Sequence, residues 1–464
     1  MQDQRADLKL HTALPVGGAG FVLLLITLFR TGGLSQGDSA DKLAVLLLVG
    51  GIAVLALILL ALEGCSPALV WALLLPVSLA LFFRVLALDH ITYDYQDFLA
   101  KWASAFREGG GFAAVKENIG NYNAPYLYFL AAISYWKVPD LYLIKLFSVL
   151  FDMLLAWGGL RLCRVFSKED SLRPAASFCL LLLLPTVILN GSYWAQCDSI
   201  YGALVLHALA SALSKKPVSS LILLAAAFSF KLQTVFIIPL WCVLWFSGRI
   251  KFRHLLLFPA AYAVTVAPAL LLGKPLADTL GVYAEQTGTY VSSLTYNAPS
   301  VFAFIPYKMP VNIRPFAIFG IAAAFLLVFL VFARLFPKRK KLSDRTILSA
   351  AVVLAAGIPF LLPYMHERYF FLAEALTVVW ACVDLNRFFS AAAVQVASLG
   401  GYYAYLRLKY LFIPNIGRYR FPLGAEALLI LIVLIISFAV MIRERDAKPA
   451  ASGKESYHGG DFSL

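Results

Sequence analysis

Long apolar runs recur along the whole sequence, and most have the length that an α-helix needs to cross a bilayer. About 20 apolar residues suffice for one crossing. Inside a bilayer every backbone polar group has to be hydrogen-bonded within the protein, which favours helices. The sequence therefore predicts an all-α, polytopic membrane helical bundle of about 14 transmembrane helices, at 13–30, 42–62, 67–88, 143–162, 173–190, 198–214, 217–230, 233–247, 253–272, 315–336, 346–362, 369–386, 390–406 and 425–443.

Composition supports the same class of protein and excludes several others. Apolar residues make up 61% of the chain and charged residues 14%, whereas soluble domains average roughly 45–50% and 25%. Such an excess of apolar residues does not fit inside one soluble core, so a soluble enzyme, a disordered scaffold and a small secreted module are excluded. The six cysteines form no CxxC pair and give no sign of a zinc site or a disulfide framework.

Much of the net charge of +13 comes from short basic loops between apolar runs, at 161–173, 215–216, 249–253, 338–341 and 443–454. Such loops lie in the cytoplasm in most membrane proteins. The runs alternate consistently if all five segments and both termini are cytoplasmic. We therefore expect a multi-pass membrane protein with its polar, aromatic loops on the extracytoplasmic face and with no nucleic-acid partner. Because loops on one side of a helical scaffold usually assemble the site, any active site is expected on that face. The short termini and loops favour a bacterial plasma membrane.

The chain is expected to divide into an N-terminal part with two extra helices (1–66), a transmembrane core (67–386), C-terminal helices (387–443) and a polar cytoplasmic tail (444–464). The core contains two large outer loops, 89–142 and 273–314. Within the first, 125–137 is apolar but short, and it is rich in tyrosine and tryptophan. This pattern is typical of a helix that lies at the membrane interface.

The first outer loop begins with acidic residues among aromatic ones, in DHITYDYQDFLAKW. Asp94 and Asp97 are either solvated loop residues or part of a partly dry aromatic wall. In the second setting a carboxylate can act as a general base. Tyr122, later in the same loop, either contacts a substrate or belongs to an aromatic belt at headgroup depth.

Two segments of the core place polar residues next to expected helices. In WAQCDSI, Trp194, Gln196 and Asp198 lie at a helix start. Asp198 can cap that helix, while the amide of Gln196 can bind hydroxyl groups. Lys231 lies between two short apolar runs, where a lysine either extends towards solvent or binds a phosphate oxygen.

The most specific segment is the turn PYMHERYFF between two apolar runs. It places His366, Glu367 and Arg368 side by side. His366 and Arg368 can both donate hydrogen bonds to a phosphate, and a purely structural ion pair of Glu367 with Arg368 is the alternative. In the second outer loop, Tyr296 and Asn297 either line an acceptor site or pack the loop.

These motifs resemble those of the GT-C superfamily, polytopic glycosyltransferases that use polyprenyl-phosphate sugars. The chain is most similar to bacterial relatives of the second mannosyltransferase of GPI-anchor synthesis, and more distantly to protein O-mannosyltransferases and N-glycan-pathway glucosyltransferases. YDYQDF, WAQCDSI followed by FKLQ, and HERYF carry the resemblance, which covers roughly 67–386. The sequence departs from related ones in having NAP at 123–125, where two prolines are frequent, and KLQ at 231–233, where Lys-Pro-Gln is frequent.

The resemblance implies a GT-C type bundle with interfacial helices in the first large outer loop, and it implies roles for single residues. Asp94 matches the acid that serves as catalytic base, and His366 matches a histidine near the donor phosphate. The block with Trp194, Gln196 and Asp198 matches one near the sugar pocket.

The expected function is transfer of a hexose, most simply mannose, from a polyprenyl-phosphate donor to an acceptor hydroxyl, with inversion. Asp94 is the expected base. The expected phosphate-binding residues are His366, Arg368 and Lys231, and the expected sugar and acceptor pocket contains Asp97, Tyr122, Trp194, Gln196, Asp198, Glu367, Tyr296 and Asn297. No cofactor or metal is required, although a divalent ion is compatible with the outer acids.

The expected partners are the polyprenyl-phosphate sugar, a glycan, glycolipid or protein acceptor, and membrane lipids. A polytopic transporter or a flippase for lipid-linked sugars is the alternative. That class should place ionisable residues deep within its membrane spans and should divide into two matching halves.

Overall fold

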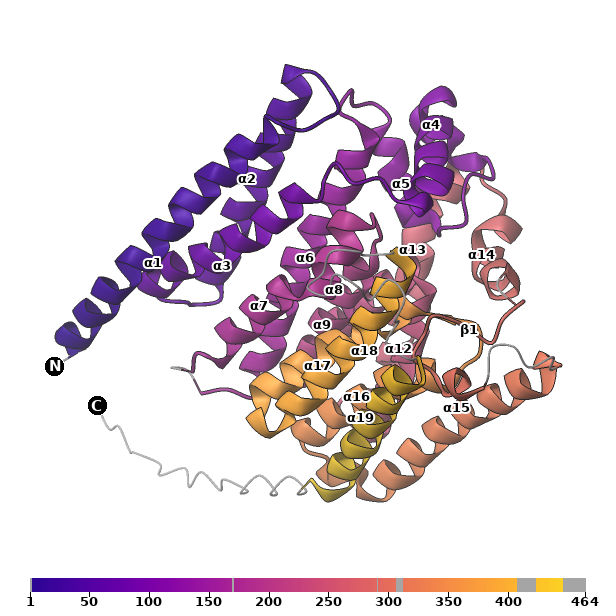
Figure 1. Cartoon of the computed structure of the whole chain (residues 1–464). Coiled ribbons are helices and arrows are strands. Elements are labelled where there is room, and N and C mark those ends of the chain that lie inside the picture. Colours follow the sequence, from indigo (N-terminus) through magenta and orange to yellow (C-terminus); the bar gives the residue numbers. More distant parts are fainter. Residues whose placement is uncertain (1, 169–170, 290, 306–311, 407–422, 445–464) are drawn as a thin grey trace, which may run out of the picture.

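Helices account for nearly all of the fold (Figure 1). The computed structural model describes residues 2–168, 171–289, 291–305, 312–406 and 423–444. The expected tail from 445 onward lies outside these residues. In chain order the α-helices are α1 (Gln2–Thr31), α2 (Ser39–Leu62), α3 (Pro67–Leu86), α4 (Ala100–Glu108), α5 (Ala124–Ile133), α6 (Asp140–Arg164), α7 (Arg173–Leu183), α8 (Pro185–Ile188), α9 (Asp198–Leu213), α10 (Pro217–Phe230), α11 (Ile238–Phe246), α12 (Phe252–Leu255), α13 (Leu257–Leu271), α14 (Leu276–Thr289), α15 (Ile313–Leu335), α16 (Asp344–Leu361), α17 (Phe371–Val383), α18 (Phe388–Leu406) and α19 (Leu423–Arg443).

Eight helices in the described part of the chain are long and apolar enough to cross a membrane. They are His11–Thr31, Ser39–Leu62, Pro67–Leu86, Asp140–Arg164, Phe252–Leu271, Ile313–Lys341, Asp344–Leu361 and Leu423–Arg443. The pair Arg173–Leu183 and Pro185–Tyr193, bent by 47°, adds a ninth if it forms one span. These helices indicate a multi-pass integral membrane protein. Each expected apolar run is helical, but several of the helices are shorter than a straight crossing, so the larger count of about 14 spans stays a prediction.

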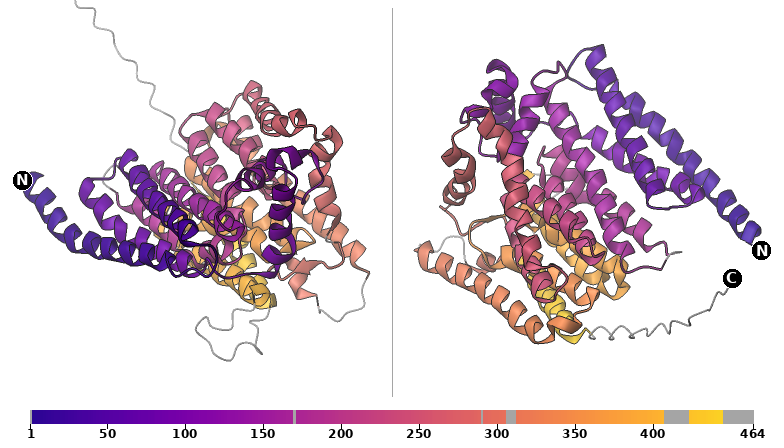
Figure 2. Two further views of the ribbon diagram at one scale, coloured as in Figure 1. Left: turned by 90° about the horizontal axis from the view of Figure 1, so that it is seen from above. Right: turned by 180° about the vertical axis from the view of Figure 1, so that it is seen from behind.

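The N-terminal helices pack on one side of the bundle, as the two views of Figure 2 show. α1 lies along α3, and glycines allow their close approach. A Cβ atom built on Gly20 would lie 2.4 Å from the backbone nitrogen of Leu75, and one on Gly17 would lie 2.2 Å from the indole ring of Trp71. The two helix backbones therefore meet where α1 carries no side chain.

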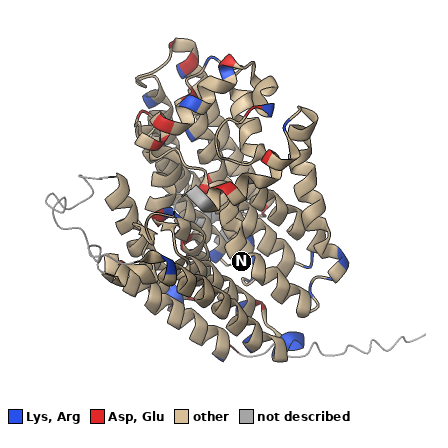
Figure 3. Ribbon diagram, turned by 90° about the vertical axis from the view of Figure 1, so that its right-hand side faces the viewer, with Lys and Arg blue, Asp and Glu red and all other residues tan. Residues whose placement is uncertain are grey.

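The two ends of the bundle differ in charge and in the length of their loops. At one end short loops carry paired basic residues: Arg164 contacts Glu63 at 2.8 Å, and Arg249 pairs with Asp344. The opposite end holds both long outer loops, including α4, α5 and α14. Figure 3 shows long stretches of helix without charged residues and a mixture of acidic and basic residues at the end with the outer loops. A helix is thus confirmed within 125–137, and its place at a membrane interface stays a prediction.

Buried polar contacts fix the start of the first outer loop. The Lys145 ammonium of α6 donates to the carbonyls of Ala87, Leu88 and His90, at 2.8, 3.0 and 2.6 Å. The carboxylate of Asp89 accepts hydrogen bonds from the Ser35 hydroxyl at 2.9 Å and from the Tyr142 hydroxyl at 2.6 Å. The loop between α1 and α2 is thereby joined to the segment that leads into Asp94.

The glycine contact between α1 and α3 gives a test of the fold. We expect Gly20→Ala to lower the stability by about 1–3 kcal/mol, because the added methyl group overlaps backbone that cannot move freely. Thermal unfolding in detergent, followed by circular dichroism, measures the effect. Gly18→Ala is the matched control, since nothing lies within 4 Å of its Cβ position. Equal melting temperatures of the two variants would contradict this packing.

Candidate active site

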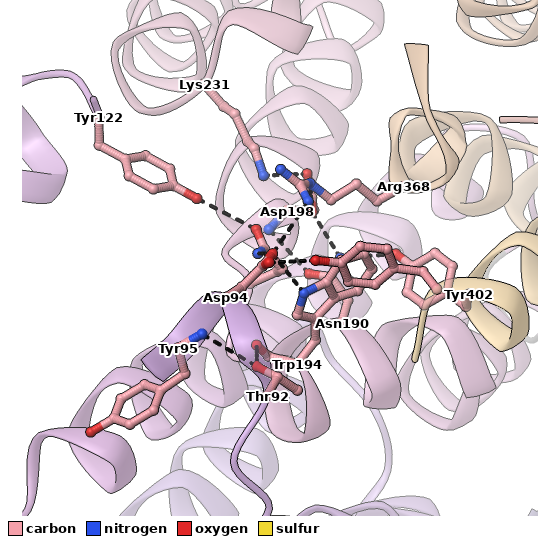
Figure 4. Close-up of polar contacts among 12 residues, drawn as sticks. Thr92, Asp94, Tyr95, Tyr122, Asn190, Trp194, Asp198, Lys231, Arg368 and Tyr402 are labelled. Carbon is pink, nitrogen blue, oxygen red and sulfur yellow. Dashed lines mark hydrogen bonds and ion pairs between the residues drawn. The ribbon is translucent and has the colours of Figure 1, made fainter. Parts of the chain in front are cut away.

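Asp94 is held by three hydrogen-bond donors from distant parts of the chain (Figure 4). Its Oδ2 accepts from the Trp194 indole at 2.9 Å and from the Gln196 amide at 3.0 Å. Its Oδ1 accepts from the hydroxyl of Tyr405 on α18. These donors fix the orientation of the carboxylate at the place where the first outer loop meets the bundle.

Two irregular helical turns bring Asp94 and its partners together. Asp94 directly precedes a five-residue π-helical turn, Tyr95–Leu99, and a second such turn, Leu189–Tyr193, directly precedes Trp194. The hydroxyl of Thr92 donates to the carbonyl of Trp194 at 3.1 Å and joins the two segments. Single π-helical turns are frequent at functional sites, but these two have no recognisable sequence signal.

Asp198 forms a second acidic centre beneath the first. Its side chain is wholly buried. It lies 2.5 Å from the ammonium of Lys231 and accepts a hydrogen bond from the Asn190 amide at 2.8 Å. Asp198 is the first residue of α9, which has no side-chain capping hydrogen bond. Its carboxylate binds Lys231 and Asn190 instead. Lys231 lies against Asp198, and its charge offsets that of a carboxylate removed from water.

The Arg368 guanidinium lies between the two carboxylates. Its Nη1 is 3.9 Å from Oδ2 of Asp94, and its Nε is 3.9 Å from Oδ2 of Asp198. Both distances exceed hydrogen-bond length, and Nε is buried without a hydrogen-bond partner in the described part of the chain. The guanidinium also lies over the Trp194 ring, 5.3 Å from its centre. Arg368 thus balances two acids electrostatically while retaining capacity to donate to an anion.

A two-residue ladder brings the second outer loop to the His366 turn. β1 (Thr295–Tyr296) pairs in parallel with β2 (Met365–His366), so that Tyr296 lies opposite His366. The two rings stack with centres 4.9 Å apart, and Asn297 forms a further bridge to His366. Burial lowers the pKa of the His366 imidazole to about 3, and the charges of Arg368 and Lys231 act in the same direction. His366 is therefore neutral at neutral pH and can act as a hydrogen-bonding group.

The same turn carries Glu367. Its side chain is wholly buried, and burial raises the pKa of its carboxyl to about 7, against the opposing effect of Arg368. A Cβ atom built on Gly401 of α18 would lie 2.7 Å from the Cβ atom of Glu367. Glu367 is thus packed against α18.

A cavity of about 360 Å³ opens over this arrangement, within the size range of small-molecule sites. It is lined by Tyr93, Asp94, Phe98, Leu99, Trp102, Asn121, Tyr122, Gln196, Tyr296, His366, Arg368 and Tyr405. Six of the residues expected from the sequence are among them. Trp194, Asp198, Glu367 and Asn297 are not among the lining residues, although each contacts or adjoins one of them. Lys231 does not line the cavity either, and it contacts Asp198. Asp97 instead pairs with Lys101 at 3.3 Å on the exposed side of the loop.

Several residues of the site were not predicted from the sequence. Tyr405, Asn190 and Tyr402 lie in apolar runs where they look like ordinary helix residues, yet Asn190 donates to both Asp198 and the Tyr402 hydroxyl, at 2.8 Å each. The contact of Tyr405 with Asp94 spans 311 residues of the chain, and that of Asn190 with Tyr402 spans 212. In the described residues, no group of three or more His, Cys, Asp or Glu side chains could hold a metal ion.

No protein-family model matches this chain, and no curated protein matches it either. The resemblance to the GT-C superfamily therefore rests on the sequence motifs alone.

The buried carboxyl of Glu367 predicts a specific pH dependence of stability. The folded protein holds this proton more tightly than the unfolded chain, in which the pKa is near 4.5. The contribution of this proton to the free energy of unfolding is therefore full below pH 4.5 and is lost as the pH rises through about 7. We expect the free energy of unfolding of the wild type to fall by roughly 3 kcal/mol between pH 5 and pH 8 through this group, and Glu367→Gln to lack this fall.

Melting temperatures of the wild type and the variant at these two pH values measure that difference. Glu108→Gln, on an exposed part of α4, is the control and should keep the wild-type pH dependence. A Glu367→Gln protein that loses as much stability as the wild type on going to pH 8 would show that Glu367 is ionised in the folded state.

Proposed function

We propose that this chain is a membrane glycosyltransferase of the GT-C type, which moves a hexose from a polyprenyl-phosphate donor to an acceptor hydroxyl. One observation carries the proposal: a fixed carboxylate, Asp94, and an incompletely satisfied guanidinium, Arg368, face the same cavity 3.9 Å apart. Transfer from a sugar phosphate needs both a group that takes a proton and a cation that stabilises the departing phosphate. A hexose, most simply mannose, is the transferred group because of the motif resemblance.

In the proposed reaction the acceptor oxygen attacks the anomeric carbon of the donor sugar. A bond forms between that oxygen and the carbon, while the bond from the carbon to the phosphate oxygen breaks and its electron pair leaves with the phosphate. The hydroxyl proton passes to Asp94. Attack from the face opposite the phosphate inverts the anomeric carbon.

Arg368 is placed to bind the phosphate because it is the cation that lines the cavity. His366, neutral before the donor binds, adds a hydrogen-bond donor from the same turn. Lys231 acts indirectly: it neutralises Asp198, so that Asp198 does not form a tight ion pair with Arg368. The phosphate thus meets a guanidinium whose two acidic neighbours are both at 3.9 Å.

The site lies at the end of the bundle that holds the outer loops, away from the loops with Arg164 and Arg249. Because basic loops are cytoplasmic in most membrane proteins, we place the cavity on the extracytoplasmic face and the N-terminus in the cytoplasm. A bacterial plasma membrane suits this arrangement, and the lipid chain of the donor would then lie in the surrounding bilayer.

A transporter or lipid flippase is the second candidate, because ionisable residues are also buried within the helices. Arg84 of α3 contacts Asp152 of α6 at 2.8 Å, and both side chains are buried. Such pairs mark ion pathways in some transporters. Here, however, Asp152 also accepts a hydrogen bond from Ser199, the residue after Asp198. The pair therefore holds the start of α9, which carries Asp198.

The proposed base gives a direct test. We expect Asp94→Asn to lower transfer from polyprenyl-phosphate mannose by at least about 100-fold, because the amide cannot take the acceptor proton. Asp97→Asn is the matched control: Asp97 lies on the same turn, is not among the cavity-lining residues and pairs with Lys101, so this variant should keep transfer within a few-fold of the wild type. Purified protein in nanodiscs, with radiolabelled donor, allows the measurement.

Two outcomes would contradict the proposal. Transfer by Asp94→Asn at the rate of Asp97→Asn would remove Asp94 from the role of base. Movement of the donor across liposome membranes by the wild type, with no cleavage of the bond between sugar and phosphate, would favour the flippase.

A further inference from the structure

Aromatic rings with unusual exposure line one wall of the cavity. Tyr93 is 72% exposed and Phe98 is 43% exposed, and both line the cavity together with Asp94. Trp102 and Tyr122 complete the wall and are half-buried. The ring of Phe98 lies 6.0 Å from that of Trp102, which in turn lies 5.7 Å from that of Tyr122. The first outer loop thus presents a connected group of rings to the cavity.

This aromatic wall, made of Tyr93, Phe98, Trp102 and Tyr122, is distinct from the cationic side of the cavity. Arg368 and His366 come from the turn before α17, whereas the wall comes from the first outer loop. In the view of Figure 4, Tyr122 and Arg368 lie on opposite sides of Asp94. The base therefore lies between a region that can hold an anion and a region that offers apolar faces.

The polar groups around the wall are two amides and the carboxylates of Asp94 and Asp97, the second of which accepts a hydrogen bond from the Tyr93 hydroxyl. Asn121 lines the cavity beside Tyr122, and the Tyr122 hydroxyl donates to the Gln196 amide oxygen at 3.4 Å. Amides both donate and accept hydrogen bonds and so match hydroxyl groups. None of the four residues that make up the wall carries a charge. Flat rings with a negative face, next to amides, match a ligand with polarised C–H groups on one face and hydroxyls at its edge.

We propose that the aromatic wall binds the acceptor, and that the acceptor is a carbohydrate which presents a ring hydroxyl to Asp94. This inference rests on the proposed function and adds the class of the acceptor and the residues that select it. The sugar ring lies over Phe98 and Tyr93, and Asn121 and Gln196 hold its hydroxyls. The reacting hydroxyl gives its proton to Asp94 as its oxygen bonds to the anomeric carbon of the donor.

The test uses Phe98→Ala, with Phe98→Trp to restore an aromatic ring. The matched control is Phe112→Ala, because Phe112 is exposed to a similar extent (38%) in the same outer loop but is not among the cavity-lining residues. Wild-type and variant proteins in nanodiscs are given polyprenyl-phosphate mannose and one of three acceptors: the methyl glycosides of mannose, glucose and galactose, a serine- and threonine-containing hexapeptide, or a long-chain alcohol.

We expect transfer to at least one methyl glycoside and none to the peptide or the alcohol. Because Phe98→Ala loses one aromatic contact, its acceptor KM should rise relative to the wild type. That rise should be about ten times as large as any rise in its donor KM. Phe98→Trp should restore the acceptor KM, and Phe112→Ala should match the wild type. Transfer to the peptide or the alcohol alone, or the same acceptor KM in Phe98→Ala and Phe112→Ala, would overturn the inference.

A binding measurement separates failure of this inference from failure of the proposed function. Saturation-transfer NMR detects contact between the methyl glycosides and the protein without any reaction. A signal in Phe112→Ala that is lost in Phe98→Ala supports the carbohydrate site even if no donor is consumed, in which case the proposed transferase activity fails. Donor consumption without any such signal supports the transferase and overturns the carbohydrate site.

Discussion

The position of one guanidinium between two carboxylates organises this protein. Arg368 lies 3.9 Å from both Asp94 and Asp198, and an unpaired charge at such depth would cost several kcal/mol. Lys231, 2.5 Å from Asp198, completes a balanced group of two acids and two bases. Because Lys231 satisfies Asp198 directly, the guanidinium is shared loosely and keeps donors for an anion. A tight pair of Arg368 with either acid would remove that capacity.

The same balance explains why segments far apart in the chain converge. Asp94 ends an irregular stretch after α3, Trp194 and Gln196 precede α9, and Arg368 precedes α17. These three segments enter the site from the same end of the helical scaffold. The helices fix the ends of the connecting loops, while the loop residues themselves are free to vary. Lys145 holds the segment that leads to Asp94, and Asp152 joins Arg84 of α3 to Ser199 at the start of α9. The helices thus supply rigidity, and the loop residues supply the chemistry.

Sequence patterns predicted the scaffold better than the site. Hydrophobic runs located the helices, because burial in lipid or protein demands apolar residues along a whole helix. The motifs also identified Asp94, Gln196, His366 and Arg368, which the structure brings to one cavity. Tyr405 and the pairing of β1 with β2 were missed, since neither a single tyrosine in an apolar run nor a two-residue strand has a distinctive local pattern. Asp97 was expected in the pocket because aromatic residues surround it in the sequence, but it is not among the cavity-lining residues and pairs with Lys101.

The central claim is that Arg368 binds the donor phosphate while Asp94 faces the anomeric carbon. The most direct measurement is a cryo-electron microscopy structure of the protein in nanodiscs with a non-hydrolysable polyprenyl-phosphonate mannose. The account predicts the phosphonate group in contact with the Arg368 guanidinium and the sugar between it and Asp94, with His366 within hydrogen-bond distance of a phosphonate oxygen. A phosphonate bound at the basic end of the bundle, or a sugar outside the cavity that Asp94 and Arg368 share, would contradict it.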